Sequence, residues 1–142
     1  MQVTTIESLD DPRLDDYAHL TEVQLRCRLE PEKGIFIAES PTVIGRALDA
    51  SCEAKSFLME ERQLETAAPL VAQAEAVAGR AVPVFTGPRT VLAGLTGYTL
   101  TRGILASMRR PALPTPEELV KKLDARHIAV LEGIVDHTNI GA

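Results

Sequence analysis

Short runs of apolar residues alternate along the chain with longer stretches that carry an apolar stripe. The apolar runs are typical of buried strands and lie at 35–38, 82–86 and 103–108, where Ser107 is the polar interruption of the last run. A further strand is expected around 55–59. The striped stretches are typical of helices and lie at 41–48, 64–78 and 90–95. Strand and helix patterns that alternate in this way predict an α/β domain.

Polar residues mark where helices are expected to begin and end. A capping side chain followed by proline is typical of a helix start, and glycine after an Ala-rich stretch is typical of a helix end. A threonine followed three residues later by glutamate resembles a capping box. The predicted starts are Asp11-Pro12, Ser40-Pro41 and Thr115 with Glu118, and the predicted end is Gly79.

Three prolines, Pro111, Pro114 and Pro116, interrupt the pattern near the end of the chain. Proline disfavours helix at the residue before it, so this stretch predicts a connector. We therefore predict one domain over 1–110, a connector with a short helix over 111–126, and the start of a further domain over 127–142. The last segment contains an apolar strand-like run without partner strands, which indicates a fragment of a longer protein.

The composition is that of an ordinary globular protein, with 142 residues of which 45% are hydrophobic. Its apolar stretches are shorter than the roughly 18 residues needed to cross a bilayer, and its first residues are acidic, unlike a secretory signal. We therefore expect no membrane partner and a cytoplasmic location. Cys27 and Cys52 lack CxxC spacing and a nearby pair of histidines. We expect both to be reduced packing residues, and we expect no metal site.

The net charge of −5 is unevenly spread along the sequence. Between residues 80 and 126 there are eight lysines and arginines against three acidic residues. This stretch predicts a locally positive face suited to phosphate groups. Composition alone leaves the alternative open that these charges are ordinary solvated surface.

The chain ends in a strand-like run followed by Asn139-Ile140-Gly141-Ala142. This end resembles the first conserved motif of the SpoU (TrmH-type) RNA ribose methyltransferases of the SPOUT superfamily, in which Asn-x-Gly-Ala follows a strand. The upstream segments 34–39 and 97–106 resemble that family's small substrate-binding domain. The resemblance implies a three-layer α/β/α RNA-binding domain of ribosomal-protein-like fold, followed by a truncated start of the SPOUT domain.

The same resemblance implies an activity for the parent protein. It would transfer a methyl group from S-adenosylmethionine to a ribose 2′-hydroxyl of rRNA or tRNA, and it would form a homodimer through the missing domain. In the family, later motifs build the cofactor pocket, so this chain alone is expected to bind no cofactor and to be inactive. Asn139 is the motif residue expected to support catalysis, and its alternative role is that of a turn residue.

Six side chains are candidate contacts to a structured RNA. Arginine can fork onto a phosphate and stack on an unpaired base, and a tyrosine can stack as well, although an aromatic residue beside a strand can instead serve packing. A carboxylate would repel RNA, so we expect Glu39 at a strand end to be structural. The candidates are Arg26, Arg28, Lys33, Tyr98, Arg102 and Arg109.

Two alternatives to a methyltransferase fragment are kept. The first is a stand-alone RNA-binding module of ribosomal-protein-like fold without catalysis. The second is a small protein-interaction domain that adds its apolar C-terminal strand to a partner. An RNA affinity that falls steeply with salt would separate the two RNA-binding interpretations from the third.

Overall fold

The computed structural model describes residues 2–6, 10–18, 20, 32–100, 103–123, 127 and 129. By its internal contacts the chain divides into two compact units, Met1–Pro111 and Ala112–Ala142. We call them unit 1 and unit 2 and describe each by itself. Of the predicted domain start over 127–142, the structure describes His127 and Ala129. The predicted motif with Asn139 lies outside the described residues.

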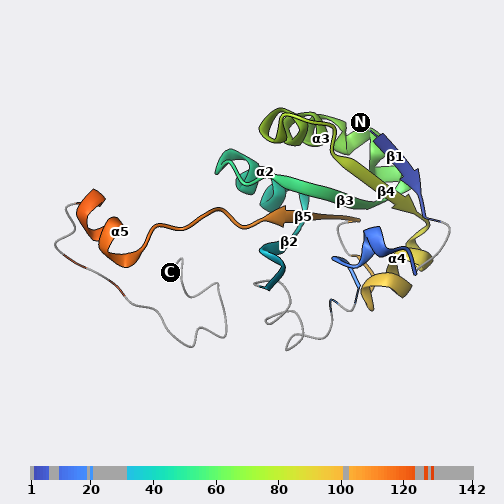
Figure 1. The fold of residues 1–142 in the computed structure, drawn as a ribbon. Helices are drawn as coiled ribbons and strands as arrows, with labels where there is room; N and C mark the ends of the chain where they lie inside the picture. The colour runs from blue at the N-terminus through green and yellow to red at the C-terminus, as the bar shows by residue number, and fades with distance from the viewer. Residues whose placement is uncertain are drawn as a thin grey trace. The chain divides into compact units, whose positions relative to one another are not determined.

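Unit 1 is built on a five-stranded mixed sheet (Figure 1). In spatial order its strands are β1 (Gln2–Thr5), β4 (Pro83–Gly87), β3 (Ala54–Glu60), β5 (Ile104–Arg109) and β2 (Ile35–Glu39). The pairs β1/β4 and β4/β3 are parallel, whereas β5 runs antiparallel to both of its neighbours, β3 and β2. The carboxyl ends of β1, β2, β3 and β4 therefore share one edge of the sheet, which we call the carboxyl edge. The opposite edge is called the amino edge.

Helices cover both faces of this sheet (Figure 1). The helices α2 (Pro41–Asp49) and α3 (Leu64–Ala78) lie on one face, with the 3₁₀ turn η2 (Glu61–Gln63) leading into α3. The 3₁₀ turn η1 (Pro12–Leu14) and the helix α4 (Arg89–Thr96) lie on the other. The predicted α/β fold is thus confirmed, with two separate apolar cores.

Strand alternation divides the apolar side chains between these two cores. In β3, Phe57 and Met59 pack with α2 and α3, whereas the intervening Leu58 packs with η1 and α4. Successive strand side chains point to opposite faces, so a sheet covered on both faces needs continuous apolar runs. This requirement explains why these strands are recognisable as mainly apolar segments, in which Ser56 and Ser107 are buried polar residues.

Two predicted helix ends of unit 1 are confirmed. Ser40 accepts a hydrogen bond from the Val43 N–H at 3.4 Å, and Gly79 ends α3 with a φ of 65°, in the left-handed region. The buried Cys52 is a free thiol, as expected, whereas Cys27 lies outside the described residues.

The N-terminal part of unit 1 differs from the prediction. Residues 2–5 form the edge strand β1, which the pattern did not indicate, because its side chains are mostly exposed and its stability comes from pairing with β4. Asp11 does cap a helical start, accepting from the Arg13 N–H at 2.9 Å. That start, however, is the single 3₁₀ turn η1, and turns follow it up to residue 18.

In unit 2 the structure describes the helix α5 (Pro116–Leu123). The predicted capping box is confirmed, because the Glu118 N–H donates to Thr115 Oγ1 at 3.2 Å and the Thr115 N–H donates to Glu118 Oε2 at 2.8 Å. Among the described helices of both units, none is long and apolar enough to span a membrane.

Candidate nucleic-acid interface

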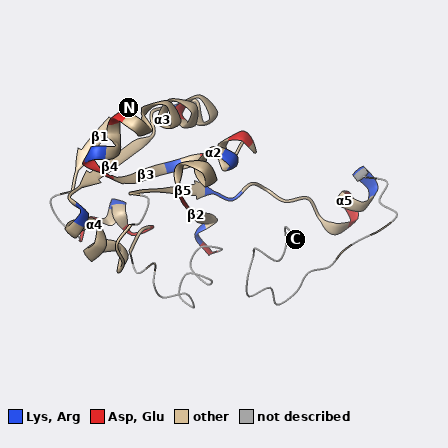
Figure 2. Cartoon of the chain, turned by 180° about the vertical axis from the view of Figure 1, so that it is seen from behind, with Lys and Arg blue, Asp and Glu red and all other residues tan. Residues whose placement is uncertain are grey.

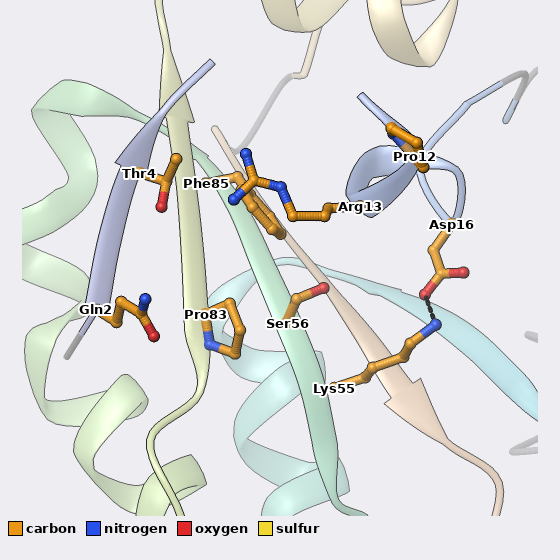
Figure 3. A pocket seen from close by; sticks show the side chains of 9 residues that line it. All are labelled: Gln2, Thr4, Pro12, Arg13, Asp16, Lys55, Ser56, Pro83 and Phe85. Carbon is orange, nitrogen blue, oxygen red and sulfur yellow. Dashed lines mark hydrogen bonds and ion pairs between the residues drawn. The ribbon is translucent and has the colours of Figure 1, made fainter. Parts of the chain in front are cut away.

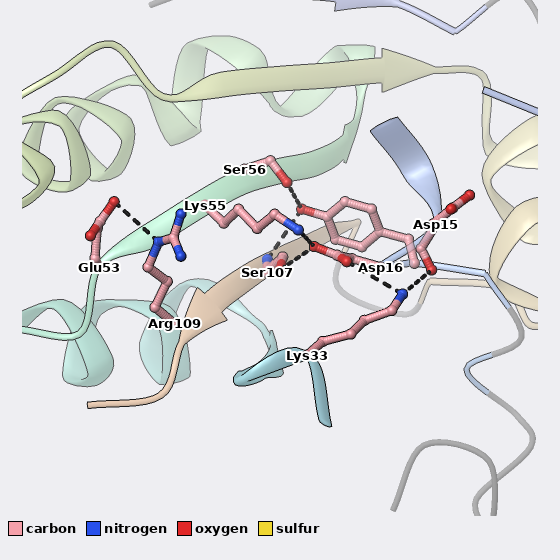
Figure 4. A network of polar contacts seen from close by, with 9 residues as sticks. Asp15, Asp16, Lys33, Glu53, Lys55, Ser56, Ser107 and Arg109 are labelled. Atoms are coloured by element: carbon pink, nitrogen blue, oxygen red, sulfur yellow. Dashed lines mark hydrogen bonds and ion pairs between the residues drawn. The ribbon is translucent and has the colours of Figure 1, made fainter. Parts of the chain in front are cut away.

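Basic side chains gather at the amino edge, where β2 and β3 begin and β5 ends (Figure 4). Two carboxylates, those of Asp16 and Glu53, form ion pairs with them. Asp16 pairs with Lys55 at 2.8 Å and with Lys33 at 3.6 Å. Glu53 pairs with Arg80 at 2.7 Å and with Arg109 at 3.4 Å. The four cations keep 37% to 55% of their side chains exposed, so they can still reach a ligand phosphate.

A buried tyrosine ties this edge to the core. The register between β3 and β5 shifts between Ala54 and Ser56, leaving Lys55 as an extra residue, as in a β-bulge. At this irregularity the Ser107 N–H donates to the Tyr17 hydroxyl at 3.1 Å, and that hydroxyl also bonds Ser56 Oγ at 2.8 Å. Tyr17 is fully buried, so its hydrogen bonds fix the turn after η1 against the sheet.

The next residue, Asp16, holds two lysines at the same place. Its Oδ2 accepts from Ser107 Oγ and from Lys55 Nζ, each at 2.8 Å (Figure 4). Burial by itself would raise the pKa of Asp16, but the hydrogen bonds from Lys55 and Ser107 and the charges of Lys55 and Lys33 outweigh it and lower that pKa. Burial raises the pKa of Tyr17 well above its usual range. Asp16 is therefore ionised and Tyr17 neutral near neutral pH.

The lowered pKa of Asp16 predicts how stability depends on pH. Because the unfolded chain binds the proton more readily, the contribution of ionised Asp16 is present above 3.8, the ordinary value, and is lost as the pH falls below it. We expect Asp16→Asn to be less stable than the wild type near neutral pH, and the gap to close in acid. Urea unfolding between about pH 7 and pH 3 measures this.

The control for this prediction is Glu118→Gln in α5. The pKa of Glu118 is also lowered, through hydrogen bonds from the Thr115 backbone and side chain, but the group is fully exposed. Glu118→Gln should change the loss of stability at acid pH less than Asp16→Asn does, because water screens exposed groups. Stability curves for wild type and Asp16→Asn that stay parallel down to acid pH would contradict the assignment.

The carboxyl edge carries a different set of polar groups. Tyr98, which follows α4, donates from its hydroxyl to Glu39 Oε2 at 3.4 Å. Glu39 is the last residue of β2, so this bond lies at the opposite edge of the sheet from Lys33 and Arg109. Glu39 thus has a structural partner, in line with the expectation from sequence.

A buried glutamate at the carboxyl edge was missed by the sequence reasoning. Glu60 ends β3 with only 7% of its side chain exposed, and it pairs with Arg62 at 2.6 Å and, more distantly, with Arg89 at 3.8 Å. Its Oε1 is buried without a hydrogen-bond partner among the described residues. The available signal was a carboxylate at the end of a buried strand, with an arginine two positions later in the sequence.

Charge is mixed over unit 1. Figure 2 shows acidic and basic positions near one another along this unit. Of the predicted positive stretch, Arg80 and Arg109 lie at the amino edge, whereas Arg89 lies near Glu60 at the carboxyl edge. Within the described residues, no group of three or more His, Cys, Asp or Glu side chains is arranged to hold a metal ion.

Known proteins resemble this chain in sequence. An uncharacterized tRNA/rRNA methyltransferase of Mycobacterium bovis is 34% identical over 133 residues, which are 94% of this chain and 43% of that protein. A similarly named Mycobacterium tuberculosis protein is 33% identical with the same coverage. The chain is a relative of these tRNA/rRNA methyltransferases. No protein-family model matches it.

Solved methyltransferase structures resemble the fold. An AdoMet-bound rRNA methyltransferase from Sinorhizobium meliloti superposes with a TM-score of 0.55 at 22% identity, covering 80% of this chain and 39% of that one. An RNA 2′-O ribose methyltransferase gives a TM-score of 0.51 at 24% identity, covering 80% and 40%. The predicted relationship to RNA methyltransferases is confirmed, and the chain spans less than half of the length of these relatives.

The six candidate RNA contacts fall into three groups by their position in the structure. Lys33 and Arg109 lie together at the amino edge, joined through the registers of β2 and β5. Tyr98 lies at the carboxyl edge. The remaining candidates, Arg26, Arg28 and Arg102, lie outside the described residues.

Proposed function

We propose that this chain is the RNA-recognition part of an S-adenosylmethionine-dependent methyltransferase that modifies a ribose 2′-hydroxyl of rRNA or tRNA. The observation that carries the proposal is the relationship to tRNA/rRNA methyltransferases over 94% of the chain, which accounts for only 43% of the relatives' length. The rest of such a protein would provide the catalytic domain. The domain division at 110, the connector over 111–126 and the motif role of Asn139 belong to the same proposal.

The amino edge supplies the chemistry that RNA recognition needs. Methyl transfer to a ribose requires the hydroxyl to be held in line with the donor, and fixing the neighbouring phosphates provides much of that geometry. Lys33, Lys55, Arg80 and Arg109 are half-exposed cations held in place by Asp16 and Glu53. The ion pairs already restrict these side chains, so binding a phosphate costs them less conformational entropy.

The cavity on the η1 face does not fit the methyl donor. It has a volume of about 350 Å³, and Arg13 and Lys55 line it. These cations would repel the sulfonium group of S-adenosylmethionine, and the one lining carboxylate, Asp16, is already paired with Lys55. We therefore assign no methyl-transfer step to unit 1, and we expect the chain alone to be inactive. The proposal includes a homodimeric parent protein working in the cytoplasm, where rRNA and tRNA are modified.

Two experiments test the proposal. The first measures binding of the chain to rRNA and tRNA transcripts at several salt concentrations, where we expect an affinity that falls steeply with salt. The second incubates the parent protein with the same RNAs and labelled S-adenosylmethionine, and maps the product by its resistance to alkaline cleavage, which requires a free 2′-hydroxyl. Absence of RNA binding by the chain would overturn its recognition role. Binding by the chain without methylation by the parent protein would leave a stand-alone RNA-binding module.

A further inference from the structure

A cavity opens on the η1 face of the sheet, and the ion pair between Asp16 and Lys55 at the amino edge forms part of its lining (Figure 3). Its volume of about 350 Å³ lies at the lower end of the range for small-ligand sites. Gln2 and Thr4 line it from β1, Ser56 from β3, Phe85 from β4 and Arg13 from η1. Three neighbouring strands and one turn thus form a single concave site within unit 1.

The planar guanidinium group of Arg13 forms a flat surface at this site, which we call the platform. Its guanidinium carbon lies 5.5 Å from the centroid of the Phe85 ring, within the distance of a cation–π contact. Three hydrogen bonds of 2.6 to 3.0 Å to the two carboxylate oxygens of Asp11 hold the guanidinium group in place. Because 60% of the Arg13 side chain remains exposed, the platform is fixed and open to a further planar group.

The charges at this site are already matched. Arg13 is paired with Asp11 at 2.6 Å, and Lys55 is paired with Asp16 at 2.8 Å. Phosphate binding through Lys55 belongs to the amino edge described above, so charge alone does not distinguish this cavity. What the cavity offers instead is a stacking surface together with the Gln2 amide and the Thr4 hydroxyl, which can pair with the polar edge of a base (Figure 3).

We propose that this cavity binds one unpaired nucleobase of the substrate RNA, stacked on the guanidinium of Arg13 and contacted at its edge by Gln2 and Thr4. Proteins recognise single-stranded RNA by stacking splayed bases on aromatic rings or arginine planes and by hydrogen bonds to base edges. The inference rests on the proposed RNA-binding function and adds to it a particular site. That site faces away from α2 and α3, on the face that carries η1.

The test titrates the chain with a single-stranded oligoadenylate, with an abasic ribose-phosphate oligomer of equal length, and with AMP, and follows backbone amides by NMR. We expect the oligoadenylate to shift the amides of Thr4, Arg13, Ser56 and Phe85, and the abasic oligomer to leave them in place. Equal shifts with the abasic oligomer would overturn the proposal. AMP binding as tight as that of the oligoadenylate would indicate a free-nucleotide site and would overturn the assignment to an RNA strand.

A variant separates stacking from charge. Arg13→Lys keeps the cation but removes the plane, so we expect the Kd for oligoadenylate to rise about fivefold or more while the salt dependence stays the same. The matched control is Arg46→Lys, on the exposed side of α2 and on the other face of the sheet, which should bind as the wild type does. An unchanged Kd for Arg13→Lys would overturn the site.

These outcomes also distinguish a failure of the proposed nucleobase site from a failure of the proposed RNA-recognition function. If rRNA or tRNA transcripts bind but the oligoadenylate does not, the nucleobase site is wrong and the RNA-recognition role stands. If neither class of RNA binds, both are wrong. Wild-type-like NMR spectra of the free variants verify that each is folded.

Discussion

Tyr17→Ala is expected to lower the free energy of unfolding by about 3 to 5 kcal/mol, the usual cost of removing a large buried aromatic side chain. Tyr17 is among the largest fully buried side chains, and it packs with Leu14, Leu58 and Leu105 between η1 and the sheet. The substitution leaves a cavity and takes away the hydrogen bond to the Ser107 N–H. Urea unfolding followed by circular dichroism measures the loss.

Tyr17→Phe measures the contribution of the hydroxyl group to the free energy of unfolding. It keeps the ring but removes the partner of Ser56 Oγ and of the Ser107 N–H, so we expect a loss of about 1 to 3 kcal/mol. Tyr98→Phe is the matched control, because that half-buried hydroxyl makes a longer bond, of 3.4 Å, to Glu39. Equal losses in the two phenylalanine variants would show that the buried hydroxyl has no special role.

The second large effect is expected in RNA binding at the amino edge. Lys33→Gln and Arg109→Gln each remove one half-exposed cation that the structure places beside the starts of β2 and β3. If each contacts a phosphate, affinity for rRNA or tRNA falls, and the slope of log K against log salt decreases by about 1 for each variant. The double variant should lose about 2 in slope, because each contact releases its own counterions.

Arg46→Gln provides the comparison for this experiment. It makes the same change of charge on α2, an exposed position away from the amino edge. A general effect of net charge would weaken binding equally in all three single variants, and that result would contradict a local phosphate contact. An unchanged salt slope in the double variant would contradict it as well.

The sequence predicted the elements of this fold that depend on neighbouring residues. The four strands β2, β3, β4 and β5 could be predicted because a sheet covered on both faces requires mainly apolar runs. Ser40, Gly79 and the pair Thr115 and Glu118 were visible because helix caps are completed within a few residues. Relationship to RNA methyltransferases was likewise carried by short local segments.

Interactions between distant segments could not be predicted in the same way. The strand β1 is defined by its pairing with β4, about eighty residues away in sequence. The bond between the Tyr17 hydroxyl and the Ser107 N–H joins residues that are 90 positions apart. No periodic pattern signals such contacts, because they arise only when the sheet assembles.

What the sequence determined by itself is therefore the α/β character, the capped ends of α2, α3 and α5, and the family relationship. Each of these depends on residues that are close together along the chain. Only the tertiary structure decided that Lys33 and Arg109 share one edge while Tyr98 lies at the other, and that Arg13 lies over Phe85 beside β1. The physical reason is that strand order and direction set these neighbours. Both are fixed by burial of the two cores as a whole rather than by any local segment.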